Sequence, residues 1–202
     1  TVERAITLLG FATVRTVATV VACGLGSAAA VPNGFWQHAS AVANAAQLIA
    51  WRFGIATGDA FTVGLLHDLG RGLLHVADPV QSAEIDLGLA GATATDAASP
   101  GLPSHPIEQH AATEPGATTD GTEESGIPRD RLQLELAAFG ITHADAAARV
   151  LTSWRFPPTM VDAIAHHHCT IERAPSDLVR LLVAAEAVAD RAFGAWGEPV
   201  DR

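Results

Sequence analysis

Apolar residues along most of this chain recur every three or four positions, the spacing that puts side chains on one face of an α-helix. Gly10, Gly54, Gly140 and Pro157 interrupt the pattern at points where helices would end. The pattern predicts helices over residues 1–9, 11–23, 35–53, 60–71, 132–139, 143–153, 158–168 and 178–193. We therefore expect an all-α fold, a bundle of some eight helices.

One long segment, residues 78–130, breaks the pattern. It is rich in Ala, Thr, Gly, Pro, Ser and acidic residues, most clearly over 91–126, and it has almost no large apolar side chains. Such a composition cannot bury enough surface to order itself, so we predict a disordered insert and discount His105 and His110 as ligands. We expect N-terminal helices over residues 1–34 and a core in two parts, residues 35–77 and 131–193. The insert, residues 78–130, separates the two parts of the core, and residues 194–202 form a tail.

Composition narrows the class of protein. The 202 residues suit one domain, and a net charge of −10 argues against nucleic acid as a direct partner. The apolar stretch at residues 16–31 contains glycines and is too short to span a membrane. Cys23 and Cys169 form no disulfide or metal pattern, which suits the cytoplasm. The chain does not begin with Met, so we expect a piece of a longer protein.

The candidate chemistry starts at His67 and Asp68, which end an apolar helix. Burying an ionisable pair is costly, and a divalent metal commonly offsets that cost where more histidines and carboxylates are available. His38 shares a helical face with Val42 and Ala45 and points inward, either as a core histidine bonded to a carbonyl or as a ligand. The further candidate ligands are His143, His167, His168, Glu186 and Asp190.

Two local patterns place these candidates. Thr142 and Asp145 have capping-box spacing, which puts His143 in the first turn of a helix. Three adjacent histidines at 166–168 cannot all face one way, and we expect His166 to face solvent. Imidazole with carboxylate suits Zn, Mn or Fe better than Ca or Mg alone.

Several segments together resemble a known family. Residues 65–71, LLHDLGR, are similar to the "LLHDIGK" core of the HD superfamily of metal-dependent phosphohydrolases, and residues 35–40, FWQHAS, to its first-histidine helix. Residues 2–10, 139–145, 154–157 and 164–168 resemble the HDOD branch, the HD-related output domains. The resemblance implies an HD-like helical bundle built around the His/carboxylate cluster.

The resemblance also implies a ligand set. It places metal at His38, His67, Asp68 and Glu186, which stands where the superfamily has its final Asp; Asp190, one turn on, is the alternative. In the related HD-GYP phosphodiesterases, the counterparts of His143, His167 and His168 help to hold a further metal. The "GYP" signature is missing, since residues 169–172 read CTIE, which argues against cyclic-di-GMP hydrolysis.

Two functions follow from the resemblance. The favoured one is a cytoplasmic, bacterial-type HDOD regulatory domain that binds divalent Fe, Mn or Zn, mono- or dinuclear, and acts on other signalling proteins or on domains of its own chain. The alternative is an active phosphohydrolase, a phosphomonoesterase or cyclic nucleotide phosphodiesterase, with Asp68 and Arg71 catalytic and a phosphorylated small molecule or nucleotide as substrate. Arg71 replaces the usual Lys and would meet the phosphate or remain a solvated helix-end charge. Glu186 stands where the superfamily has Asp, and Arg71 stands where it has Lys. These two replacements favour the regulatory domain over the active phosphohydrolase.

Overall fold

The computed structural model describes residue 3, residues 11–96 and residues 129–193. In these ranges every regular element is a helix, which confirms the all-α prediction. The predicted helix over residues 1–9 and the tail lie outside the described residues. The elements are α2 (Phe11–Ala22), η1 (Ala28–Ala30), α3 (Phe35–Ile49), η2 (Ala50–Phe53), α4 (Thr57–Leu66), α5 (Leu69–Ala77), α6 (Pro79–Asp96), α7 (Arg129–Phe139), α8 (His143–Ser153), α9 (Pro158–Ala165) and α10 (Asp177–Phe193).

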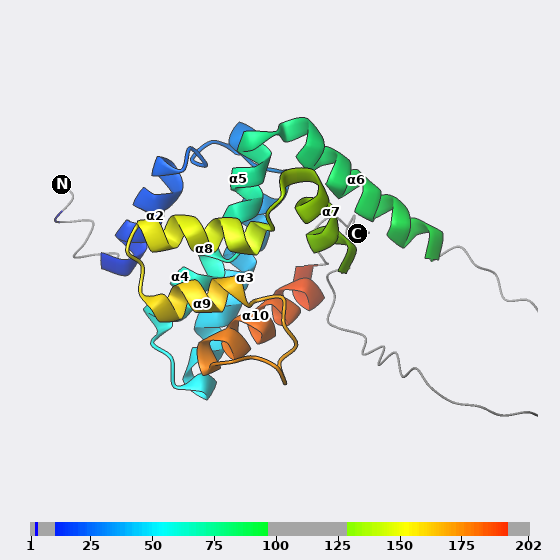
Figure 1. The fold of residues 1–202 in the computed structure, drawn as a ribbon. Coiled ribbons are helices and arrows are strands. Elements are labelled where there is room, and N and C mark those ends of the chain that lie inside the picture. Colours follow the sequence, from blue (N-terminus) through cyan, green and yellow to red (C-terminus); the bar gives the residue numbers. More distant parts are fainter. Residues whose placement is uncertain (1–2, 4–10, 97–128, 194–202) are drawn as a thin grey trace, which may run out of the picture.

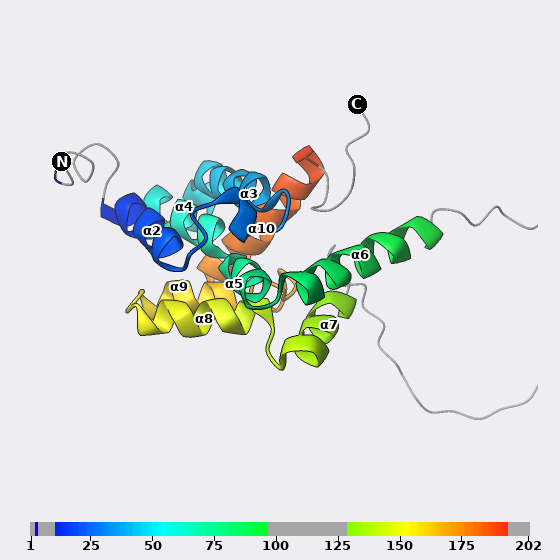
Figure 2. The ribbon, with the colours of Figure 1, turned by 90° about the horizontal axis from the view of Figure 1, so that it is seen from above.

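The helices α3, α4 and α10 form the centre of the bundle (Figure 1). Helix α3 packs on both α4 and α10, and α9 also packs on α4 and α10. Helix α5 packs on α8, which packs on α9, and in Figure 2 α8 and α9 lie along the lower side of the bundle. The helices α6 and α7 lie side by side at one edge, where α6 packs on α5.

A single apolar core runs through these helices. Its fully buried members include Val42 of α3, Val63 of α4, Ile164 of α9 and Leu182 of α10. Helices α3 and α4 approach closely at Gly64, because a Cβ there would lie 2.6 Å from the Cα of Ala43. This close approach brings His38 of α3 beside the end of α4.

Helix α6 corrects the prediction of a disordered insert from residue 78. The Asp78 carboxylate accepts hydrogen bonds from the backbone N–H groups of Val80 and Gln81, which starts the helix. Ser82 and Ile85 are buried, so one turn of this small-residue helix is held by packing. The rest of the predicted insert, residues 97–128 with His105 and His110, lies outside the described residues.

Several helix ends and faces differ from the prediction. The predicted 35–53 helix finishes in the short η2, and the positive φ of Gly54, 66°, ends it as expected. In α2, helical spacing predicts a core face of Val14, Val17, Ala18 and Val21, but Val17 and Val21 are exposed, while Thr16 and Thr19 are buried. Periodicity located this helix but not its buried face. None of the described helices is both long and apolar enough to cross a membrane.

Candidate metal centre

The sharp turn between α4 and α5 sets up the site. Helix α4 ends at Leu66, and His67 and Asp68 occupy the turn before α5 begins at Leu69. The His67 side chain is 0% exposed and that of Asp68 is 5% exposed. The pair therefore lies inside the bundle, as the apolar context predicts.

The first half-site is the group His38, His67 and Asp68, whose ligand atoms lie within 4.8 Å of one another. The Nε2 atoms of His38 and His67 are 3.2 Å apart. Asp68 Oδ2 lies 3.8 Å from His38 Nε2 and 3.6 Å from His67 Nε2. Two imidazoles about 2.1 Å from one tetrahedral or octahedral ion have nitrogens about 3.0–3.4 Å apart, so the spacing suits a shared metal.

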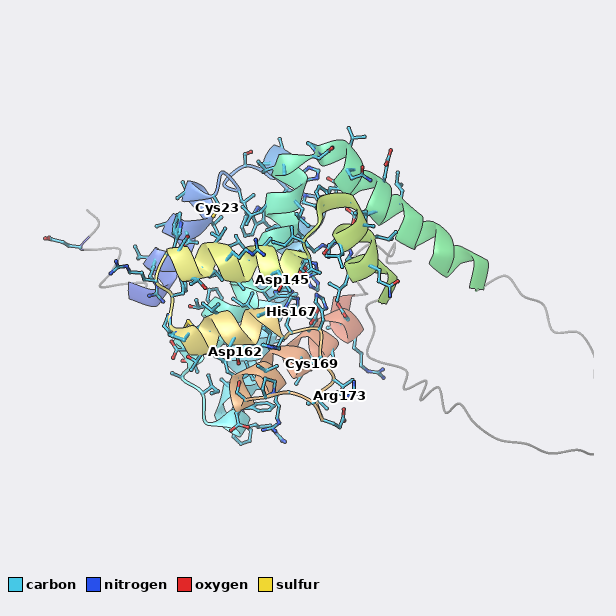
Figure 3. All side chains as sticks on the ribbon, in the orientation of Figure 1. Cys23, Asp145, Asp162, His167, Cys169 and Arg173 are labelled. Atoms are coloured by element: carbon cyan, nitrogen blue, oxygen red, sulfur yellow. The ribbon has the colours of Figure 1, made fainter. Side chains whose placement is uncertain are left out.

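The second half-site is the group His143, His167 and His168, which meets the same spacing limit. His143 starts α8, where Thr142 accepts a hydrogen bond from the backbone of Asp145 as the capping-box spacing predicts. The other two follow the end of α9 at Ala165, where Figure 3 labels His167. The histidine run is a turn and not the predicted continuation of the helix, so two neighbouring side chains can face inward. His166 points outward, as expected, with a side chain 52% exposed.

Asp68 lies between the two half-sites and presents one oxygen to each. Its Oδ2 faces the first half-site, while Oδ1 lies 3.4 Å from His143 Nε2 and 3.8 Å from His167 Nε2. Gly70 makes this approach possible, since a Cβ there would lie 1.8 Å from the backbone oxygen of His143. One carboxylate is thus placed to bridge two ions.

Hydrogen bonds on the far side of the rings orient three of the histidines. Each Nδ1 lies against a protein acceptor: Gly64 O at 2.7 Å for His67, Glu135 Oε2 at 2.6 Å for His143 and Ile164 O at 2.6 Å for His167. Assigning the proton to each Nδ1 leaves the Nε2 lone pairs directed at Asp68. Nε2 of His167 is buried and has no hydrogen-bond partner in the described part of the chain.

The electrostatics favour neutral imidazoles beside an ionised carboxylate at every cluster histidine except His167, where burial lowers the pKa but Asp68 and Glu186 raise it above its usual value. Burial lowers the pKa of His67 to about 3, and it also lowers the pKa values of His38, His143 and His168. Burial alone would raise the pKa of Asp68, but His67 and Arg71 hold it well below its usual range. Neutral imidazole and carboxylate are the protonation states that bind a transition metal, so the residues present fit a divalent ion.

The α10 carboxylates lie beside the half-sites but belong to neither group. Asp190 Oδ1 is 3.8 Å from His38 Nδ1, on the side of the ring away from Asp68. Glu186 is 8% exposed, and burial raises its pKa to about 8. Burial also raises the pKa of Asp190. The structure thus puts both carboxylates near the cluster but outside the two groups, and their roles as ligands stay a prediction.

A chain of charged side chains runs from Arg71, beside Asp68, to Glu135, beside His143, and three of its members, Asp86, Arg131 and Glu135, were not predicted from the sequence. Arg71 Nη1 is 3.4 Å from Asp68 Oδ2, and its Nη2 is 3.3 Å from Asp86 Oδ1. Arg131 also donates to Asp86 Oδ1 and lies 3.3 Å from Glu135 Oε1. Glu135 in turn accepts from both the ring and the backbone N–H of His143.

Of Asp86, Arg131 and Glu135, only Glu135 left a signal in the sequence. Glu135 stands three residues after Leu132 and four before Phe139, on the helical face that these two apolar residues mark. In the structure Glu135 and Arg131 are the buried residues of α7, while Leu136 is exposed. A carboxylate at a core-facing position of a helix was the available clue. Arg71 is not the solvated helix-end charge that was one alternative, because its side chain is 11% exposed and ion-paired with Asp68. Contact with a phosphate, the other alternative, stays a prediction.

Comparison with known proteins places this arrangement in a family. The HDOD domain family profile matches residues 1–98 and 109–170, which includes much of the segment expected to be an insert. No curated protein matches the chain.

Two crystal structures resemble the fold. A candidate phosphohydrolase from Shewanella amazonensis SB2B is 25% identical with a TM-score of 0.59, over 95% of this chain and 60% of that one. The MmoQ response regulator from Methylococcus capsulatus str. Bath is 25% identical with a TM-score of 0.54, over 98% of this chain and 65% of that one. The chain thus spans less than two thirds of either protein. With an HD-like bundle, two His/Asp half-sites and a profile match over most of its length, the chain belongs to the HDOD domain family.

Proposed function

We propose that this chain is an HDOD regulatory domain that holds divalent metal between its two half-sites, with Asp68 as the bridge. The donor set and the ring orientations support the metal. Imidazole nitrogens with one carboxylate suit Fe, Mn or Zn, and the ions would give the converging Nε2 lone pairs a partner.

The observation that carries the regulatory role is the burial of the centre. The side chains of His67, His143 and His167 are 0 to 1% exposed. Catalytic metal sites keep a position open for substrate or water, whereas closed sites serve structure or sensing. Because the closed centre lies where four helices meet, gain or loss of metal would change how these helices pack. The surface that partners contact would change with them. The partners we propose are other signalling proteins or domains of a longer chain, consistent with the response regulator among the similar structures.

A second function, phosphohydrolysis, is favoured by one specific contact. The guanidinium of Arg71 reaches Asp68 at the edge of the first half-site, where a cation could also neutralise a phosphoryl group. When bound, metal would supply Lewis acidity and a more acidic water. The resemblance to a candidate phosphohydrolase supports this alternative. The position of Glu186, which belongs to neither half-site, weakens the case for phosphohydrolysis.

The experiment that tests the proposal measures metal content and turnover together. Purified protein and its H67A/D68A variant are assayed by mass spectrometry for Fe, Mn and Zn, and with phosphomonoesters and cyclic nucleotides. We expect near-stoichiometric metal that the variant loses, and no turnover above that of the variant. Turnover that disappears in the variant would replace the regulatory role with phosphohydrolysis. Absence of metal after incubation with Mn and Fe would overturn the metal centre itself.

A further inference from the structure

The two buried arginines beside the cluster share a single carboxylate. Asp86 Oδ1 accepts from Arg131 Nη2 and lies 3.3 Å from Arg71 Nη2. The arginines come from distant parts of the chain, the start of α5 and the first turn of α7, and Asp86 comes from α6 between them. One oxygen held between two guanidinium groups is the arrangement that an oxygen of a phosphate group would also satisfy.

The arginines are fixed independently of Asp86. Arg71 is anchored by Asp68, and Arg131 by Glu135, whose side chains are 5% and 2% exposed. The arginine side chains are themselves only 11% and 10% exposed. Both guanidinium groups would therefore stay in place if the Asp86 carboxylate moved away.

Asp86 is the outermost member of this set. Its side chain is 34% exposed, about three times as much as either arginine, so its carboxylate is the member of the set most open to solvent. It also stands on α6, where Ser82 and Ile85 are the buried residues among the side chains described, residues 79–87. An anion arriving from solvent would take the place of this carboxylate without disturbing the core.

We propose that Arg71 and Arg131 form a binding site for a phosphate group, and that Asp86 occupies it as an internal, displaceable anion. The ligand class is inorganic phosphate or the phosphate end of a small phosphomonoester. The site adjoins the first half-site through Asp68, but it consists of protein groups alone. The inference therefore goes beyond the proposed function and does not depend on metal. Displacement of Asp86 by a ligand would loosen α6 from α5 and α7.

The test measures phosphate binding to chelator-treated protein by isothermal titration calorimetry. Asp86→Ala removes the internal competitor and suits a helix interior. If Asp86 occupies the site nine-tenths of the time, its removal should tighten phosphate binding about tenfold. The matched control is Asp177→Ala, which removes a carboxylate from an exposed pair with Arg180, 2.7 Å apart. The control should leave phosphate binding unchanged.

A second pair of variants locates the binding. Adding Arg131→Gln to Asp86→Ala should abolish the gain in phosphate affinity, whereas adding Arg180→Gln should preserve that gain. A parallel titration with phenyl phosphate separates the two ligand sources: tighter binding of phenyl phosphate indicates a monoester, and equal or weaker binding indicates the free ion. Asp86→Ala without a gain in affinity, or a gain that survives Arg131→Gln, would overturn the proposal and leave the arginines as a clamp between helices.

A measurement on the unaltered chain covers the case in which Asp86→Ala fails to fold. Side-chain NMR signals of Arg71 and Arg131 are followed during a phosphate titration, with signals assigned from single Arg→Lys variants. Both should shift together and saturate, while the Arg180 signal stays still. Equal shifts at all three arginines, or none at Arg71 and Arg131, would contradict the site.

Discussion

The two half-sites are made of the same kinds of side chain but are supported in different ways. In the first, His67 is oriented by a backbone carbonyl of its own helix, and His38 comes from the neighbouring central helix α3. In the second, His143 is oriented by the Glu135 carboxylate of α7, which is itself tied to α6 through Arg131 and Asp86. The first half-site is thus supported within the core, while one ring of the second, His143, depends on two helices at the edge; His167 is oriented by the backbone carbonyl of Ile164.

This difference suggests how one bundle could hold metal and also respond to a signal. Backbone support in a packed core is insensitive to changes at the surface. Side-chain support from an edge helix shifts when that helix shifts. We infer that the first half-site keeps its geometry and that the second is the variable one.

The largest expected effect comes from the glycines that allow each half-site to form. Gly70→Ala places a Cβ against the His143 carbonyl, and Gly64→Ala places one against the Ala43 backbone. Each should lower the free energy of unfolding by more than about 4 kcal/mol, since backbone must move. Thermal and urea unfolding measure this. Gly58→Ala, where a Cβ meets nothing within 4 Å, is the control and should change stability by less than about 1 kcal/mol. A mild effect of Gly70→Ala would mean that α5 and α8 lie farther apart than described.

A smaller effect should separate the half-sites. Glu135→Gln removes the charge that orients His143, while leaving His38 and His67 untouched. Loss of such a supporting carboxylate weakens metal binding about 10- to 100-fold, and here only the second ion should be affected. Competition with a chromophoric chelator measures both affinities. The exposed Glu84→Gln is the control. Equal weakening at both half-sites would remove the distinction between them.

The pH dependence of the metal-free protein tests the neutral imidazoles. The pKa of His67 falls from about 6.5 in the unfolded chain to about 3 in the folded one, and the pKa values of His38, His143 and His168 are also lowered. As the pH drops below about 6.5, the unfolded chain therefore takes up more protons at these rings, and the folded state loses stability. Glu186 opposes this between about pH 8 and 4.5, because its raised pKa lets the folded state take up a proton first.

The four imidazoles with lowered pKa values outnumber the three groups with raised pKa values, Glu186, Asp190 and His167, so the net effect should be destabilising. We expect the urea midpoint of the metal-free protein to fall from pH 7 to pH 5. His166→Ala, at an exposed ring, should not change this dependence. A midpoint that is flat or rises on acidification would show that the rings are not held neutral.

The smallest expected effect tests whether the cap of α8 holds the His143 ring in position. Thr142→Ala removes the side-chain oxygen that caps α8, which should cost about 1 kcal/mol of stability. Because the cap sits next to His143, the second ion should also bind a few-fold more weakly. Thr152→Ala, at an exposed hydroxyl near the other end of α8, is the control for stability and for binding. Equal effects from both substitutions would show that the cap does not position the ring.

The sequence allowed the helical class and the positions of the six clustered residues to be predicted because both depend on local patterns. Helical periodicity turned His38 inward, and the end of an apolar helix placed His67 and Asp68. The family resemblance then supplied the partners of these residues.

The support of the second half-site was beyond prediction. Asp86 and Arg131 meet across 45 residues, and neither carries a local signal. Helix α6 was missed because composition alone suggested disorder, while a capping aspartate and a short buried stretch hold it. Such contacts depend on how helices pack, which periodicity does not determine.

The most direct test of the account is the number of metal ions per chain in four proteins. After reconstitution and desalting, the unaltered chain should hold about two ions, and His67→Ala and His167→Ala should each hold about one. Asp68→Ala should hold almost none, because both half-sites share its carboxylate. Circular dichroism confirms that each variant is folded. If folded Asp68→Ala retained the metal content of the unaltered chain, Asp68 would not be the bridge, and the two half-sites would not form one centre.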